Sequence, residues 1–214
     1  MSGDGNYIAA IRDHSGRLSQ YTLSLYNRTT NQIEIITDRI KYGSGGIGLP
    51  VSLSDDGRYV AFSTALPLNQ ADRDDQDDVY VYDRELGQFE LVSQAGAGGF
   101  VLAGITADGS SVGFYGTGPS GDIFIHDRSS GNDQRLAYGI GAILSKNGKY
   151  VAFYAGTDAR VLSVSSKQIK SVGTNSRPVA ISNNATVVLT TDRQLVAYDN
   201  NEKHDIYMKE VVFD

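Results

Sequence analysis

The residues best suited to chemistry lie in one acidic segment, Asp72-Arg73-Asp74-Asp75-Gln76-Asp77-Asp78, in which five of seven side chains are carboxylates. Neighbouring anions repel one another unless they are solvated, protonated or bound to a cation. Oxygen ligands that alternate along the chain are typical of short calcium-binding loops. We therefore predict a Ca²⁺ site with Asp72, Asp74 and Asp78 as ligands. A solvated hairpin tip remains the alternative, because the glycine that bends an EF-hand loop is absent.

A weaker copy of this pattern lies closer to the C-terminal end. Asp199, Asn201 and Asp205 are its candidate ligands, and Asp205-Ile206-Tyr207 matches Asp78-Val79-Tyr80. We therefore expect two equivalent loops, each leading into an equivalent strand.

Other residue types give no catalytic or cofactor-binding motif. The chain has no cysteine, and its histidines, His14, His126 and His204, have no metal-ligand spacing. No Gly-x-Ser-x-Gly sequence is present. The glycine-rich runs at 43–46 and 96–99 lack the lysine and the helix that a phosphate-binding loop needs. We predict no catalytic residue and no cofactor other than the Ca²⁺ above.

The segments that must position the acidic loop belong to an internal repeat. The phrase Leu53-Ser-Asp-Asp-Gly-Arg-Tyr-Val-Ala-Phe62 returns at Ile105–Phe114 and at Leu144–Phe153, with weaker copies after Met1 and Ile181. The copies lie roughly 40 to 50 residues apart, which is the period of a β-propeller blade. Each Asp-Gly or Asn-Gly pair is a turn signal between two strands.

One repeat contains four short segments rich in strand-forming residues, at 49–54, 59–63, 78–83 and 89–93. A lone four-stranded sheet exposes two apolar faces, and packing sheets around an axis buries both. We predict an all-β fold: one β-propeller of five mostly four-stranded antiparallel blades, at about 1–40, 41–95, 96–138, 139–174 and 175–214. The first copy leaves no residues for an innermost strand. We expect residues 205–214 to pair near the N-terminus and close the ring, with completion of the last blade or of the first left open. We also expect helix to be scarce.

The innermost strands of such a ring would line its axis, where propeller enzymes usually act. The predicted inner strands are Leu49–Ser54, Val101–Thr106, Gly141–Ser145 and Pro178–Ser182, and none contains a charged residue or histidine. Glycosidases need paired carboxylates at the reacting bond. The sequence therefore indicates a protein that is not an enzyme.

The phrase Ser-x-Asp-Gly-x-x-Val-Ala-Phe, followed by Asp78-Val-Tyr-Val-Tyr-Asp83, resembles the TolB-like propeller repeat along essentially the whole chain. It differs from the WD repeat because the chain has no tryptophan. The resemblance implies a propeller, and relatives of this repeat serve as protein-interaction modules of bacterial envelopes or as gating domains before peptidase domains.

Charge and hydropathy limit the kinds of partner and the location that we expect for this protein. A net charge of −6 argues against nucleic acid, since binding phosphate needs clustered Lys and Arg. No apolar run approaches the roughly 20 residues of a membrane-spanning helix, and no secretory signal begins the chain. We expect an intracellular protein or a component of a virion or other assembly rather than an envelope protein.

The leading functional hypothesis is a non-enzymatic interaction or structural module, for example in a phage particle or a secretion complex. A propeller lectin that binds glycans is the alternative, and a propeller glycosidase is less favoured. The lectin hypothesis predicts a repeated polar and aromatic pocket between blades.

Overall fold

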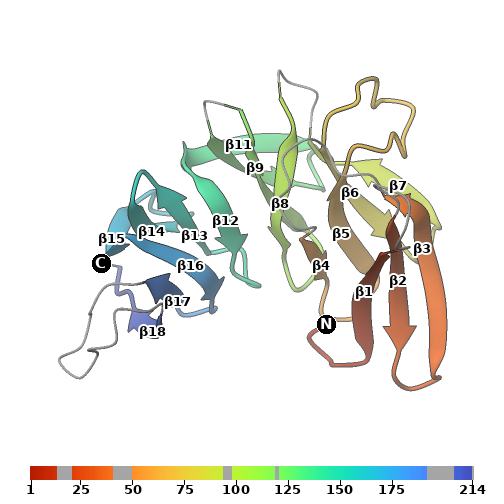
Figure 1. The fold of residues 1–214 in the computed structure, drawn as a ribbon, viewed down its shortest axis with the longest axis horizontal. Coiled ribbons are helices and arrows are strands. Elements are labelled where there is room, and N and C mark those ends of the chain that lie inside the picture. The colour runs from red at the N-terminus through yellow and green to blue at the C-terminus, as the bar shows by residue number, and fades with distance from the viewer. Residues whose placement is uncertain (14–20, 41–49, 94–97, 119–120, 192–204, 214) are drawn as a thin grey trace.

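The structure, a computed structural model, consists of strands arranged in five antiparallel sheets (Figure 1). It describes residues 1–13, 21–40, 50–93, 98–118, 121–191 and 205–213. Within those ranges there is no helix, and so none that could cross a membrane. The predicted all-β fold with five sheets is confirmed.

Sheets two, three and four have four strands each, and sheets one and five have three. Sheet one holds β1 (Tyr7–Asp13), β2 (Tyr21–Asn27) and β3 (Gln32–Ile40). Sheet two holds β4 (Val51–Leu53), β5 (Tyr59–Thr64), β6 (Asp78–Asp83) and β7 (Gln88–Leu91). Sheet three holds β8 (Phe100–Ile105), β9 (Ser111–Gly116), β10 (Asp122–Asp127) and β11 (Asn132–Tyr138). Sheet four holds β12 (Ile140–Leu144), β13 (Tyr150–Ala155), β14 (Asp158–Ser163) and β15 (Ile169–Thr174), and sheet five holds β16 (Ser176–Ile181), β17 (Thr186–Thr191) and β18 (Asp205–Glu210).

The sheets follow one another along an arch, and the two chain ends lie apart (Figure 1). As expected, sheet one has no innermost strand among the described residues. Of the two outcomes left open for this segment, the structure shows completion of the last sheet: β18 pairs with β17, from Thr186 opposite Glu210 to Thr191 opposite Asp205. No strand pairing joins sheets one and five in the described part of the chain, so the expected closure of the ring is not observed there.

The repeated phrase forms the same turn in each sheet because its polar side chains accept hydrogen bonds from the backbone amides of the turn. In sheet two, Ser54 Oγ donates to Asp56 Oδ1 at 2.6 Å. Asp56 Oδ1 also accepts from the Arg58 amide at 2.9 Å, and the Tyr59 amide donates to Ser54 Oγ at 2.9 Å. Gly57 closes the turn with φ of +70°, a conformation that favours glycine.

Backbone bonds join these turns to one another across the sheets. The Asp4 amide donates to Asp55 O at 3.0 Å, and the Asp55 amide donates to Ala107 O at 2.7 Å. The Ala107 amide then donates to Lys146 O at 2.7 Å. The row ends where the Asn147 amide donates to Asn183 Oδ1 at 2.9 Å. These bonds between neighbouring turns therefore link all five sheets along the arch.

Four apolar clusters fill the four junctions between neighbouring sheets. Their largest fully buried side chains include Phe62, Tyr80, Phe114 and Phe153. Burying one such side chain stabilises the fold by roughly 1.5–3 kcal/mol. Each sheet therefore depends on its neighbours, as the repeat predicts.

An arginine clamps sheet two to sheet one. The guanidinium of Arg84 lies over the Tyr7 ring, 4.4 Å from its centroid. It also pairs with Glu34 at 2.8 Å and donates to Gly57 O at 3.1 Å. We call this arrangement of arginine, tyrosine, glutamate and glycine carbonyl an arginine latch.

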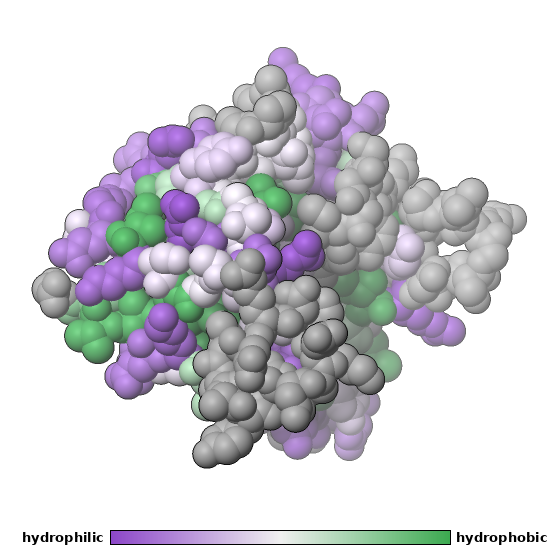
Figure 2. All heavy atoms as spheres, turned by 60° about the vertical axis from the view of Figure 1, so that its left-hand side comes forward, coloured by the Kyte–Doolittle hydropathy of each residue, from purple (hydrophilic) through white to green (hydrophobic). Residues whose placement is uncertain are grey.

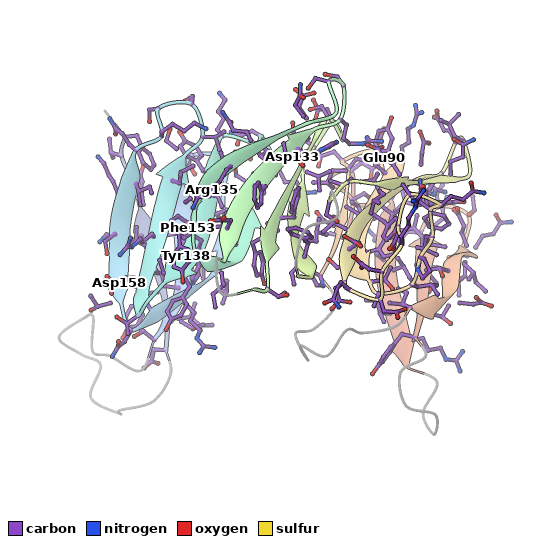
Figure 3. All side chains as sticks on the ribbon, turned by 90° about the horizontal axis from the view of Figure 1, so that it is seen from above. Glu90, Asp133, Arg135, Tyr138, Phe153 and Asp158 are labelled. Atoms are coloured by element: carbon purple, nitrogen blue, oxygen red, sulfur yellow. The ribbon has the colours of Figure 1, made fainter. Side chains whose placement is uncertain are left out.

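A second arginine latch clamps sheet three to sheet two. Arg128 lies over the Tyr59 ring at 4.2 Å, pairs with Glu90 at 2.7 Å and donates to Gly109 O at 2.7 Å. Figure 3 shows Glu90 on β7 and Asp133 on the neighbouring β11. The latch forms at both junctions because the Asp-Arg pair ends β6 and β10 in the same way.

Candidate functional site

The acidic segment lies between β5 and β6, and the structure brings its three predicted ligands together. Asp72, Asp74 and Asp78 each place one carboxylate oxygen within 4.8 Å of the other two. Of the other acids in the segment, Asp75 is exposed, and neither it nor Asp77 belongs to this group. Alternate positions along the loop therefore converge, as a short calcium loop requires.

Two of the three carboxylates are buried and held by side chains of sheet two. Asp78 opens β6, is 4% exposed, and accepts a hydrogen bond from Ser93 Oγ at 2.6 Å. Asp72 is 7% exposed and accepts a short hydrogen bond from the Tyr80 hydroxyl. The half-buried Asp74 donates its amide to Asp72 Oδ1 at 3.2 Å.

Burial and mutual repulsion make this group electrostatically unfavourable in the absence of a cation. Burial, opposed by the hydrogen bond from Ser93, raises the pKa of Asp78 from 3.8 to about 6, and the charges of Asp72, Asp74 and Asp77 add to the increase. Burial and the bond to Asp72 raise the pKa of the Tyr80 hydroxyl, which remains a donor. A hard divalent cation with oxygen ligands would relieve the repulsion.

Sequence reasoning missed Tyr80 and Ser93, which orient two of the acids. The missed signal was the alternation of Asp78 and Tyr80 along a strand, which places both on one face. The Tyr80 hydroxyl also accepts a hydrogen bond from the Leu68 amide at 3.3 Å. Tyr80, on β6, therefore bonds to the loop at both Leu68 and Asp72.

The second predicted acidic loop falls mostly outside the described residues, because Asp199 and Asn201 lie there. Asp205 opens β18, the third strand of its sheet, as Asp78 opens β6. Its Oδ2 atom is buried and has no hydrogen-bond partner among the described residues. The strand match at Asp205 is therefore confirmed, whereas a metal site there stays a prediction.

The observed inner strands β4, β8, β12 and β16 carry no carboxylate. The expectation that they also carry no cation is wrong at one residue, because β16 begins two residues earlier than predicted and includes Arg177. The Arg177 guanidinium lies 5.7 Å from the Tyr154 ring centroid and lines a cavity of about 360 Å³.

Lys146, in the turn after β12, donates to Leu53 O at the end of β4. Burial lowers the pKa of Lys146.

Of the histidines and glycine-rich runs singled out in the sequence, the structure describes His126, Gly98 and Gly99. His126 is buried, with Nδ1 2.7 Å from Asp133 and Nε2 3.9 Å from Glu90, so it helps to join sheets two and three. His14, His204 and the glycines at 43–46 lie outside the described residues. Gly98 and Gly99 lead into β8 rather than into a helix.

Solved β-propellers are similar to this chain in fold. TolB from Acinetobacter baumannii matches 98% of this chain with a TM-score of 0.69 and 18% identity, over 50% of its own length. A TolB from Agrobacterium tumefaciens matches 98% with a TM-score of 0.64 and 17% identity, over 74% of its length. The β-propeller domain of the Trilobed protease from Pyrococcus furiosus, described as having an open velcro topology, matches 96% with a TM-score of 0.65 and 12% identity, over 66% of its length.

No family model matches the chain, and a comparison with curated proteins found no match. The chain spans half the length of the Acinetobacter protein and about three quarters of the Agrobacterium protein. Likeness at these identities shows the fold alone, which is that of a TolB-like β-propeller.

Proposed function

Because the chain has a TolB-like propeller fold, we propose that it is a non-enzymatic protein-interaction module that works as a component of a larger assembly. The observation that carries the proposal is the outer side of sheet five. Ile206 and Met208, on the edge strand β18, are 72% and 76% exposed. Large exposed apolar side chains on an edge strand invite pairing with another chain.

The exposed residues share one face of sheet five. Val187 and Leu189 pack against sheet four, so the alternate residues of β17 point away from it. Val188 pairs with Met208 and Thr190 pairs with Ile206, which places these side chains on that outward face. Figure 2 brings the left-hand side of Figure 1 forward and shows hydrophobic side chains reaching the surface between hydrophilic ones.

The edge strand of sheet five indicates how a partner would bind. In the described part of the chain, sheets two, three and four end in β7, β11 and β15, and sheet five ends at β18. An extended segment of a partner protein can add to such an edge through backbone hydrogen bonds, with alternate side chains covering Ile206 and Met208. The partner we propose therefore supplies a β-strand with apolar residues at every second position.

The test is to introduce a photo-crosslinking residue at Glu210, which is exposed on β18 and has the same parity as Ile206 and Met208, and to compare crosslinking in the native protein and two variants. We expect a crosslinked partner or assembly with the native chain, its loss by at least about tenfold in I206K/M208K, and its retention in L86K. Leu86 is a suitable control because it is 64% exposed in the β6–β7 turn. Analytical ultracentrifugation separates a second copy of the chain from a different protein. Absence of any partner or assembly, or equal crosslinking in I206K/M208K, would contradict the proposal.

We propose in addition that Asp72, Asp74 and Asp78 bind Ca²⁺ as a structural ion that fixes the β5–β6 loop. The convergence of their carboxylates within 4.8 Å supports this role. The ion would stabilise the module and take no part in a reaction.

The lectin and glycosidase hypotheses receive less support. A lectin requires similar pockets between blades, but the cavity lined by Tyr154 and Arg177 differs in composition from the cavity between sheets three and four, which Asp127 and Gln134 line. A glycosidase requires two carboxylates at one site on the axis. The described inner strands offer Arg177 there instead.

A further inference from the structure

The junction between sheets three and four lacks an arginine latch. The Arg84 and Arg128 amides each donate to the residue that precedes the second strand of their own sheet, at Arg58 O and Ser110 O. In sheet four the Val164 amide makes the same bond to Lys149 O at 2.9 Å. Val164 therefore occupies the place that arginine takes in the two latches.

The other latch residues are replaced at this junction as well. The latch glutamates Glu34 and Glu90 lie opposite Leu25 and Val81. Gln134 lies opposite Ile125, the counterpart of those two residues in sheet three. Ser111 follows the sheet-three turn as Tyr7 and Tyr59 follow theirs.

A cavity occupies the place of the missing latch. Its volume is about 570 Å³, which exceeds the size of an arginine side chain. Its lining is mostly polar and includes Ser111, Asp127, Asn132, Gln134, Gly148 and Val164. Gly148 corresponds to Gly57 and Gly109, whose carbonyls accept hydrogen bonds from the latch arginines.

The exposed carboxylate of Asp127, which accepts hydrogen bonds from Ser129 and Ser130, also lines the cavity. In sheet two, Asp83 pairs with Arg58 at 2.8 Å. In sheet three the counterpart of Asp83 is Asp127, and the counterpart of Arg58 is Ser110. Hydrogen bonds from Ser129 and Ser130 hold the pKa of Asp127 below its usual value, so it is ionised at neutral pH. No salt bridge reaches Asp127 within the described residues.

Lys146 also lines the cavity, but its ammonium group is held elsewhere. Lys146 Nζ donates to Leu53 O and lies 3.5 Å from Ile105 O, at the ends of two inner strands. It therefore leaves Asp127 available for a cation from outside.

We propose that the cavity between sheets three and four binds the guanidinium group of an arginine supplied by a partner protein. The Asp127 carboxylate gives the charge, and the Gln134 amide oxygen and the Gly148 carbonyl act as the remaining acceptors. A planar guanidinium with five donors suits such a set of acceptors better than an ammonium group does. The site is separate from β18 and does not depend on strand addition there.

The first experiment is an NMR titration with L-argininamide, with the uncharged analogue citrullinamide as the matched ligand. We expect saturable shifts of the Ser111, Gln134 and Gly148 amides at millimolar argininamide, and none with citrullinamide. D127N should weaken binding by roughly tenfold, since it removes a charge-assisted hydrogen bond. The D75N variant, whose exposed acid lies outside the cavity, serves as the control and should bind normally.

The second experiment fills the site from within. V164R should abolish the argininamide shifts, because the new side chain reaches the Gln134 and Gly148 acceptors, whereas V164M should retain them. Both variants should keep the crosslinking at β18. No saturable shift up to about 50 mM argininamide, equal response to citrullinamide, or unchanged binding in D127N would each overturn the proposal. The D127N result stands even if V164R fails to fold.

Discussion

Asp78 illustrates how a single position can serve binding at the expense of stability. It is buried beside two other acids, and Ser93 donates to its Oδ1 atom. Its raised pKa means that the folded chain holds the proton more tightly than the unfolded chain does. Ionising Asp78 therefore destabilises the folded chain, and a bound cation can offset this destabilisation.

The sign of this effect gives a pH prediction. Without metal, the Asp78 contribution lowers the unfolding free energy as pH rises from about 4 to about 6, and the loss remains above that pH. A shift from 3.8 to about 6 corresponds to at most about 3 kcal/mol. We expect D78N to reduce this loss in EDTA, as measured by denaturant unfolding at pH 4 and pH 7.5.

Calcium should reverse the loss in the native chain. At pH 7.5, Ca²⁺ should raise the midpoint of thermal unfolding of the native protein and of D75N, in which an exposed acid outside the group is changed. It should leave D78N unchanged, because a ligand is missing. An equal rise in D78N and the native chain would show that the ion binds elsewhere.

At the scale of the elements, the repeated turn and the arginine latch depend on each other. The turn glycine gives the preceding sheet's tyrosine room to approach, and the arginine then lies over that tyrosine. A Cβ added at Gly57 would lie 2.3 Å from the Tyr7 ring, which Arg84 covers. The Asp-Gly pair therefore determines sheet packing as well as the turn.

A matched pair of substitutions tests this dependence. G57A and G131A both place alanine at a positive φ, of 70° and 68°, which costs roughly 1–2 kcal/mol in either case. Nothing lies within 4 Å of the added Cβ at Gly131. We expect G57A to cost at least about 1 kcal/mol more than G131A in urea unfolding, because the Tyr7 ring must move. Equal costs would show that the turn and the latch are independent.

At the scale of the whole molecule, the arch gives its five sheets unequal support. Sheets two, three and four each have neighbours on both sides, whereas β18 is the edge strand of sheet five and no pairing links that sheet to sheet one in the described part. Stability in such stacks is approximately a sum over sheets and junctions. The end sheets should therefore open most readily, which also leaves β18 accessible to a partner.

Hydrogen exchange measures this difference directly. We expect amides of β17 in sheet five to exchange faster than those of β13 in sheet four, because each is the second strand of its sheet but only β13 lies between two packed sheets. Binding of the partner at β18 should slow exchange in β17. Equal protection of β13 and β17 in the free chain would show that another surface already covers sheet five.

Much of the fold could be predicted because the repeat is local and regular. The Asp-Gly turns and the alternating segment 78–83 each predict strands over a few residues, and the apolar faces of those strands require stacking. The convergence of Asp72, Asp74 and Asp78 was also predictable, since alternate residues of one loop supply all three oxygens. Tyr80 and Ser93 were missed because their contacts depend on the strand pairing rather than on spacing.

The sequence by itself determined five all-β sheets and the place of the acidic loop, because both follow from short-range spacing and the need to bury alternate side chains. Only the tertiary structure decided that β18 joins β17 rather than the N-terminal sheet, that Arg177 lies on an inner strand, and that one junction holds a cavity instead of an arginine. These features depend on contacts between sheets far apart along the chain. A local sequence pattern does not determine whether a strand such as β18 pairs with sheet five or with sheet one.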